Sequence, residues 1–258
     1  MAKKGRLVNV GLGMTLGSHI TPLSRSYIEK ADIVFVAASN NLVEQWVETM
    51  NDNVVSLQQY YNEGTSRMIT YRKMVEVMMT EVRAGKNVCG AFYGHPGVFA
   101  WPPHKSIKIA RDEGYHAHME PGISAEDCLY ADLNIDPGTF GCIHYEASYF
   151  MFRNKAVDPT SYLILWQVGV AGDRTLAKFS VESNSKQILV DKLLRTYPKD
   201  HKVFVYECAL LPIDDVRIEQ IKLCEIAHAD ISLKSTVVIP PSEIVTPDDE
   251  SVKQLENL

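Results

Sequence analysis

The stretch that decides the fold is NVCGAFYGHPGVF, residues 87–99. Residues 87–93 are apolar and predict a buried strand, and the run Gly94-His95-Pro96-Gly97 that follows cannot continue a regular element. In open α/β sheets, ligands bind at the carboxyl ends of such strands. The predicted ligand contacts are Tyr93, His95, Val98 and Phe99, the last two as an apolar floor for a nucleoside. The alternative is a tight crossover loop in which His95 only completes local hydrogen bonds.

Two further segments resemble this arrangement of a strand followed by glycines. A strand predicted at residues 7–11 runs into Gly11-Leu12-Gly13, where glycines let the backbone approach a ligand closely. A dinucleotide-binding fingerprint would need its third glycine at Leu16, so a dehydrogenase is disfavoured. Pro121-Gly122 precedes Ser124-Ala125-Glu126-Asp127, a capping box that predicts a helix start with free amides near the same sheet edge.

Strands and helices alternate along residues 1–148. Thr21 and Pro22 have the N-cap and first-turn preferences of a helix start, and residues 33–37 predict another strand. Residues 67–83 predict a long helix, because apolar side chains recur there every three or four positions, and residues 102–113 predict a shorter one. The alternation predicts an α/β fold with a mostly parallel sheet covered by helices on both faces.

Residues 149–241 predict a second α/β lobe with a mixed sheet. The predicted strands are residues 162–168, 203–208 and 236–239, and the predicted helices are residues 185–197 and 216–223. Residues 242–258 are acidic and weakly apolar, so we expect a frayed tail or a helix that needs a partner to order it.

Composition excludes several classes of protein. The 258 residues carry a net charge of −6, with an isoelectric point near 5.8, which does not favour nucleic-acid or membrane binding. The five cysteines form no Cys-x-x-Cys pair, which argues against disulfides and a thiolate metal site. The apolar run near residues 162–172 is too short to span a bilayer, and glycines interrupt the apolar N-terminal stretch. We therefore expect a cytoplasmic protein without a metal.

Together, and in this order, three segments resemble the tetrapyrrole methylase superfamily: Val10-Gly11-Leu12-Gly13, residues 93–99 and Pro121-Gly122-Ile123-Ser124-Ala125. Trp166-Gln167-Val168-Gly169, Tyr206-Glu207-Cys208-Ala209 and residues 235–241 fall where that family's second lobe reaches its cofactor. The resemblance implies a two-lobed tetrapyrrole-methylase-like fold, a homodimer, and S-adenosylmethionine bound between the lobes. The cofactor contacts that it implies are Gly11, Gly13, Tyr93, His95, Val98, Phe99, Ser124, Ala125, Gln167, Cys208, Ala209 and Thr236.

Within that superfamily, the chain is more similar to the borosin methyltransferases, which methylate backbone amides of a ribosomally synthesised peptide. Tyr60-Tyr61, Arg67 and Tyr71 carry this similarity, together with residues 92–99, 126–133 and 145–148. The chain departs from the borosin pattern at Gln58, where the resemblance predicts a tyrosine. Fused borosin enzymes carry their substrate as a C-terminal extension, whereas this sequence ends soon after Ile239-Pro240-Pro241. We therefore expect iterative methylation of a separate precursor peptide.

The residue types suit that chemistry. A peptide nitrogen is a poor nucleophile because its lone pair is delocalised into the carbonyl group. Arg67 and Tyr71 are four residues apart on one predicted helix, so they share a face, and the guanidinium favours a phenolate that could act as a base. Tyr61 or Tyr93 could donate a hydrogen bond to the developing oxyanion.

Other interpretations of the same residues stay open. Arg67 and Tyr71 could form a surface stacking pair, with the other tyrosines half-buried in the core. The chain could instead be a tetrapyrrole or precorrin-type methylase, or a cofactor-binding partner protein that has lost its catalytic activity.

Overall fold

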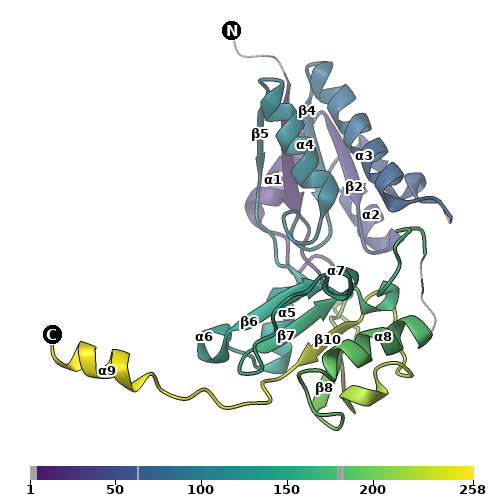
Figure 1. Ribbon diagram of the computed structural model, residues 1–258. Helices are drawn as coiled ribbons and strands as arrows, with labels where there is room; N and C mark the ends of the chain where they lie inside the picture. Colours follow the sequence, from purple (N-terminus) through teal and green to yellow (C-terminus); the bar gives the residue numbers. More distant parts are fainter. Residues whose placement is uncertain (1–4, 63, 179, 181–182) are drawn as a thin grey trace. The chain divides into compact units, whose positions relative to one another are not determined.

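The computed structural model describes residues 5–62, 64–178, 180 and 183–258. The chain divides into two compact units (Figure 1). The N-terminal unit comprises Met1–Ile135, Asp173–Phe179 and Glu207–Arg217, and the C-terminal unit comprises Asp136–Gly172, Ser180–Tyr206 and Ile218–Leu258. This division differs from the boundary placed at residue 148 from the sequence, because the strand at Cys142–Glu146 pairs within the second sheet.

The N-terminal unit contains a five-stranded sheet in the order β3-β2-β4-β1-β5, and its neighbouring strands are parallel. Its strands are β1 (Arg6–Gly11), β2 (Ile33–Ala37), β3 (Val54–Ser56), β4 (Asn87–Phe92) and β5 (His116–Met119). Its helices are α1 (Pro22–Lys30), α2 (Asn41–Glu48), α3 (Arg67–Arg83), α4 (Trp101–Asp112) and α5 (Ala125–Leu133), with a short 3₁₀ helix at Gln58–Tyr60. The α/β fold class with a parallel first sheet is therefore confirmed.

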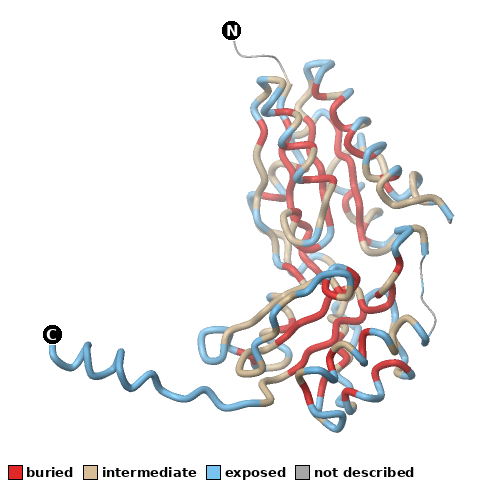
Figure 2. The backbone as a smooth tube through the Cα atoms, viewed as in Figure 1, coloured by how far each residue is buried: buried red, intermediate tan, exposed pale blue. Residues whose placement is uncertain are grey.

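Local sequence signals set the helix starts. The Thr21 side chain accepts a hydrogen bond from the Ser24 amide and caps α1, which has Pro22 in its first turn. Ser124 and Asp127 form the predicted capping box of α5. The strands β1, β2 and β4 are buried along nearly their whole length (Figure 2). Because both of their faces are buried, two apolar clusters form, one on each side of the sheet.

Three glycines lie at the carboxyl edge of this sheet, where the chain leaves β1, β4 and β5. A Cβ atom on Gly11 would lie 2.5 Å from the Gly94 carbonyl oxygen and 2.7 Å from the Gly122 Cα. A Cβ atom on Gly122 would likewise lie 2.5 Å from the Gly94 oxygen. Three backbone segments therefore meet at a separation that only glycine allows.

The C-terminal unit contains a mixed sheet in the order β6-β7-β10-β8-β9, in which β6 is parallel to β7 and β10 is antiparallel to both β7 and β8. The strands are β6 (Cys142–Glu146), β7 (Tyr162–Trp166), β8 (Lys202–Glu207), β9 (Arg217–Lys222) and β10 (Thr236–Ile239). The helices are α6 (Pro137–Phe140), α7 (Ala147–Phe152), α8 (Ser183–Leu193) and α9 (Asp249–Glu256), with 3₁₀ turns at Val168–Val170 and Leu223–Glu225. The predicted mixed sheet is confirmed.

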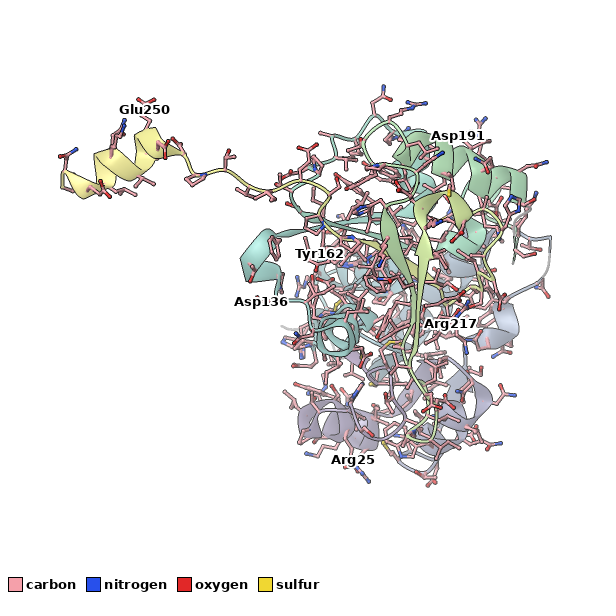
Figure 3. The ribbon with its side chains drawn as sticks, turned by 90° about the horizontal axis from the view of Figure 1, so that it is seen from below. Arg25, Asp136, Tyr162, Asp191, Arg217 and Glu250 are labelled. Carbon is pink, nitrogen blue, oxygen red and sulfur yellow. The ribbon has the colours of Figure 1, made fainter. Side chains whose placement is uncertain are left out.

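One predicted element of this lobe is wrong. Residues 216–223 were predicted as a helix, but Arg217–Lys222 form the edge strand β9, and Figure 3 labels Arg217 at its start. Ile218 and Ile221 are three residues apart, which is a helical spacing. An edge strand with mostly exposed residues needs no strict alternation of apolar and polar side chains, so the sequence lacked the usual strand signal there.

The C-terminal segment forms the helix α9 at Asp249–Glu256, capped by Asp248, and all of its residues are exposed. Figure 3 labels Glu250 on this helix. Among the described residues, none of the helices has the length and the apolar character needed to cross a bilayer.

We predict that Gly11→Ala lowers the free energy of unfolding by about 2 to 3 kcal/mol, because the new methyl group clashes with backbone rather than with a movable side chain. Gly64→Ala is the control, since Gly64 has a φ of +77° but nothing within 4 Å of its Cβ position. Conformational strain alone should cost that variant about 1 kcal/mol. Urea unfolding of both variants measures the difference, and equal losses would contradict the steric argument.

Candidate functional site

The carboxyl edge of the N-terminal sheet holds the first two predicted loops together. Gly13 and Gly94 pair as an isolated antiparallel bridge, in which the Gly94 amide donates to the Gly13 oxygen at 2.8 Å and the Gly13 amide donates to the Gly94 oxygen at 3.2 Å. Both residues have positive φ angles, +74° and +65°. The predicted loops after β1 and β4 are thus adjacent, as the parallel topology requires.

The loop after β4 is held by its own histidine. The Gly97 amide donates to His95 Nδ1 at 2.8 Å, and the Val98 amide donates to the His95 oxygen at 3.1 Å. His95 therefore completes local hydrogen bonds, as the alternative interpretation predicted, whereas its contact with a ligand stays a prediction. Tyr93 and Phe99 are 51% and 48% exposed, so the loop presents two aromatic rings at its surface.

The helix α5 starts at the same edge. The amide and the hydroxyl of Ser124 both donate to Asp127 Oδ2 at 2.7 Å, and the Asp127 amide donates back to Ser124 Oγ at 3.4 Å. Ser124 is buried and its side chain serves the cap, while Ala125 is the first helical residue and is partly exposed. Amides of the first turn have no partner within their own helix and can bind a ligand.

A distant segment also reaches this edge. The Thr15 hydroxyl donates to the Ala209 oxygen at 3.1 Å, and the Leu16 amide donates to the Leu210 oxygen at 3.0 Å. Cys208 precedes this contact, and burial together with Cys208 raises the pKa of Cys128 in α5 to about 12. Cys208 and Ala209 therefore belong with the N-terminal loops.

Gln167 and Thr236 lie in the C-terminal unit. Gln167 has a φ of +58° and ends β7 before the 3₁₀ turn at Val168–Val170. Thr236 is buried at the start of β10, where it pairs with Tyr206. Their predicted role in cofactor binding stays a prediction.

The predicted catalytic tyrosines form an aromatic cluster at the start of α3. The rings of Tyr61 and Tyr71 meet edge to face with centroids 6.4 Å apart, and Tyr71 stacks on Trp101 at 6.4 Å. Burial raises the pKa of Tyr61, and so do the neighbouring Tyr71 and Tyr93 and a side-chain hydrogen bond with Tyr71, whereas Arg67 lowers it. Tyr61 therefore stays a neutral phenol that can donate a hydrogen bond.

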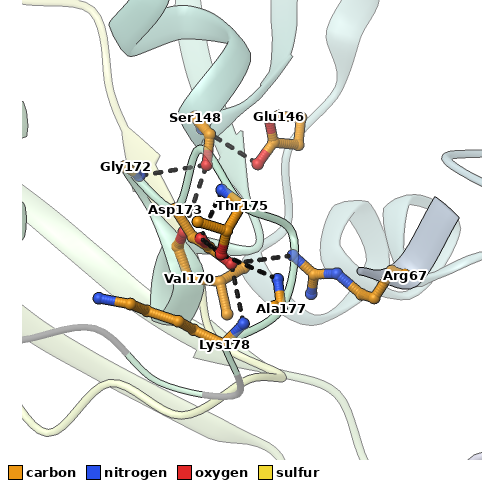
Figure 4. Close-up of polar contacts among 9 residues, drawn as sticks. All are labelled: Arg67, Glu146, Ser148, Val170, Gly172, Asp173, Thr175, Ala177 and Lys178. Carbon is orange, nitrogen blue, oxygen red and sulfur yellow. Dashed lines mark hydrogen bonds and ion pairs between the residues drawn. The ribbon is translucent and has the colours of Figure 1, made fainter. Parts of the chain in front are cut away.

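Arg67 opens α3 with a partly buried side chain, 20% exposed. Its Nη2 lies 3.9 Å from Oδ2 of Asp173, whose side chain is only 1% exposed (Figure 4). This carboxylate is the only acidic group within salt-bridge distance of Arg67 in the described part of the chain. Arg67 thus contributes a positive charge beside the tyrosines, and its partner comes from residues far along the sequence.

Sequence reasoning did not find Trp101, Asp173 or Thr15. Trp101 could have been suspected because it starts a helix directly after the loop of residues 93–99. Asp173 and Thr15 had no local signal, since their contacts join residues more than 100 positions apart. Gln58, where the resemblance predicts a tyrosine, donates from its side-chain amide to the Ala38 oxygen at 2.8 Å, just beyond β2.

The sequence matches the family model of Tetrapyrrole (Corrin/Porphyrin) Methylases over residues 6–223. It is 44% identical to the methyltransferase/ribosomally synthesized cyclic peptide gymnopeptides precursor of Gymnopus fusipes, over 98% of this chain and 61% of the relative. It is 40% identical to the corresponding omphalotin A precursor of Omphalotus olearius, over 99% of this chain and 62% of the relative. The chain therefore spans about three fifths of the length of these relatives.

Two solved structures show the same fold at low sequence identity. Uroporphyrin-III C-methyltransferase from Thermus thermophilus, complexed with S-adenyl homocysteine, has a TM-score of 0.62 and 15% identity, covering 92% of each chain. Cobalt precorrin-4 methyltransferase has a TM-score of 0.65 and 17% identity, covering 91% of this chain and 94% of the other.

We predict a pH effect from the raised pKa of Tyr61. Above about pH 10 the unfolded chain releases this proton while the folded chain keeps it, so the free energy of unfolding falls as the pH rises. Tyr61→Phe lacks this proton, and its stability should fall less steeply, by up to ~1.4 kcal/mol per pH unit. Urea unfolding of both proteins at neutral pH and above pH 10 tests this; parallel pH dependences would rule it out.

Proposed function

The chain belongs to the tetrapyrrole methylase family, and we propose that it transfers methyl groups from S-adenosylmethionine to backbone amides of a precursor peptide. The observation that carries the proposal is the cluster of Tyr61, Arg67 and Tyr71 at the start of α3. The relatives at 40 to 44% identity, whose names join a methyltransferase to a peptide precursor, support the same substrate class.

The residues of the N-terminal unit fit the proposed cofactor. The close approach of the backbone at Gly11, Gly94 and Gly122 forms an edge lined by main chain, with the exposed rings of Tyr93 and Phe99 beside it. Aromatic rings suit an adenine base, and the first-turn amides of α5 suit a carboxylate. When bound, S-adenosylmethionine would supply an electrophilic methyl group on a sulfonium.

We propose that the cofactor is bound by the residues that the family resemblance implies. In the N-terminal unit they are Gly11, Gly13, Tyr93, His95, Val98, Phe99, Ser124, Ala125, Cys208 and Ala209, and in the C-terminal unit they are Gln167 and Thr236. The T. thermophilus enzyme, which shares the fold, was solved with the demethylated form of this cofactor.

In the mechanism that we propose, the chain's own residues make the amide reactive. The Arg67 guanidinium stabilises negative charge on the amide oxygen, which makes the amide proton easier to remove and so allows the nitrogen to act as a nucleophile. In this proposal Tyr71 acts in its phenolate form and takes the amide proton, becoming a neutral phenol, while the neutral phenol of Tyr61 donates a hydrogen bond to its oxygen. The deprotonated nitrogen would be the acceptor of the methyl group that bound S-adenosylmethionine supplies, with the neutral thioether as the leaving group.

A methylase of a tetrapyrrole or similar macrocycle is the second candidate, which the family model and the shared fold favour. The two macrocycle enzymes compared above are only 15 to 17% identical to this chain. The relatives named as peptide precursors are 40 to 44% identical to it. Methylation of an amide requires activation of a poorly nucleophilic nitrogen, which a cluster of phenols around an arginine can provide. Methylation of carbon does not have this requirement. We therefore propose the peptide as substrate.

We further propose that the enzyme acts as a homodimer and methylates several amides of one precursor in succession. The relatives are named as methyltransferase and precursor together, and a precursor peptide supplied as a separate chain is the direct test of action in trans. Mass spectrometry should show successive additions of about 14 Da, one for each methyl group that is transferred.

We predict that Arg67→Lys lowers kcat for peptide methylation about 100-fold, because a lysine cannot reproduce the planar charge of the guanidinium. Calorimetric affinity for S-adenosylmethionine should stay unchanged, which separates binding from turnover. Arg72→Lys, an exposed position on the same helix, is the matched control and should retain full activity. Undiminished methylation by Arg67→Lys would show that the guanidinium takes no part in the reaction. If the unmodified protein binds S-adenosylmethionine but methylates no peptide, it would instead be a catalytically inactive partner protein.

A further inference from the structure

Asp173 is a buried acidic residue that belongs to the N-terminal unit although the chain on both sides of its segment belongs to the C-terminal unit. Its carboxylate lies 3.9 Å from the Arg67 guanidinium (Figure 4). A buried charge is costly unless hydrogen bonds and an opposite charge compensate it.

The surrounding loop fixes the carboxylate. Asp173 Oδ1 accepts hydrogen bonds from the Thr175 amide at 2.9 Å and the Thr175 hydroxyl at 2.6 Å, and Oδ2 accepts one from the Lys178 amide at 2.9 Å. Burial acts to raise the pKa of Asp173, but these hydrogen bonds and one from the Ala177 amide outweigh it, and the pKa lies below its ordinary value. The group is therefore an anion with a set orientation.

The same loop also holds the backbone of the helix that carries Arg67. The Arg67 amide donates to the Leu176 oxygen at 2.8 Å, whereas the Ser66 side chain makes no capping hydrogen bond with any described residue. Leu176 has a φ of +56°, a conformation that is unfavourable for leucine and that the surrounding contacts must maintain. The loop thus caps α3 with its main chain and faces the first side chain of α3 with its carboxylate.

We propose that Asp173 is a positioning residue that holds the Arg67 guanidinium in the orientation needed to stabilise the reacting amide. This inference rests on the proposed function of Arg67. At 3.9 Å the contact is longer than a hydrogen bond, so it directs the guanidinium without using its N–H groups, which stay available to a substrate oxygen. Among the described residues, the hydrogen bonds to the carboxylate come from its own loop, which leaves the charge itself to act on Arg67.

The chain offers a matched control in Asp158. Its Oδ1 accepts from the Thr160 amide at 2.9 Å and from the Thr160 hydroxyl at 2.7 Å, which is the same Asp-x-Thr turn. Asp158 is exposed, and no described arginine or lysine lies within salt-bridge distance of it. In such turns the Asn side-chain oxygen can accept the hydrogen bonds that Oδ1 accepts, whereas its NH2 group cannot accept those that Oδ2 accepts from the Lys178 amide in one turn and from the Ser161 hydroxyl in the other. Asp173→Asn and Asp158→Asn therefore remove one charge each from equivalent turns.

The experiment compares both variants with the unmodified full chain on a precursor peptide. We expect Asp173→Asn to lower kcat about 10- to 100-fold, as small misplacements of a catalytic group do, with unchanged affinity for S-adenosylmethionine. Asp158→Asn should leave kcat within about twofold. In a double-mutant cycle, Asp173→Asn should cause little further loss in the Arg67→Lys background, because the residue that it orients is already replaced. Equal activity of the two Asn variants, or fully additive losses with Arg67→Lys, would overturn the inference.

A readout that is independent of turnover separates this inference from the proposed function. The side-chain Nε–H signal of Arg67 in the nitrogen-15 NMR spectrum can be assigned by its disappearance in Arg67→Lys. We expect Asp173→Asn to shift and narrow this signal, because the guanidinium gains freedom, and Asp158→Asn to leave it unchanged. An unmoved signal in Asp173→Asn overturns the inference. A moved signal in a protein that methylates no peptide supports the positioning of Arg67 and overturns the proposed function alone.

Discussion

The close approach of three backbone segments at Gly11, Gly94 and Gly122 is the constraint on which the site depends. Parallel strands bring the ends of β1, β4 and β5 to one edge, but ordinary side chains would keep the following loops apart. With glycine at positions 11 and 122 both segments approach the Gly94 oxygen, and the bridge between Gly13 and Gly94 ties two of the loops together. The exposed rings of Tyr93 and Phe99 and the first turn of α5 lie next to that contact, so the candidate binding surface depends on the absence of side chains there rather than on any strong single interaction.

Much of the fold was predictable because its signals are local. The helix at Arg67–Arg83 has the bounds predicted from side-chain periodicity, and the strand at Ile33–Ala37 has those predicted from its apolar, β-branched residues. Ser124 and Asp127 form the predicted cap. The edge strand β9 was not predictable, because exposure on both faces removes the alternation that marks a strand. Asp173 was not predictable either. Its role follows from a contact between distant segments, and the surrounding sequence resembles any polar loop.

The sheets that define the fold and the residues that we propose for catalysis lie in different parts of the molecule. Enzymes that methylate macrocycles have the same fold at 15 to 17% identity, so the sheets and their order do not determine the substrate. The residues that we propose for amide methylation lie around the N-terminus of α3, where the ring of Tyr71 contacts those of Tyr61 and Trp101 beside Arg67. The sequence identified the tyrosines and the arginine through resemblance, whereas the stacking of Trp101 on Tyr71 required the structure.

The N-terminal unit is assembled from three separate stretches of chain, Met1–Ile135, Asp173–Phe179 and Glu207–Arg217. During synthesis the parallel sheet can form once its five strands have left the ribosome, since all of them lie before residue 120. The ion pair between Asp173 and Arg67 can form only after about fifty further residues have been synthesised. The contact between Ala209 and Thr15 requires almost forty more. A nascent chain would therefore have its parallel sheet well before the contacts of its candidate site, and β9 and β10 of the second unit would still remain to be made.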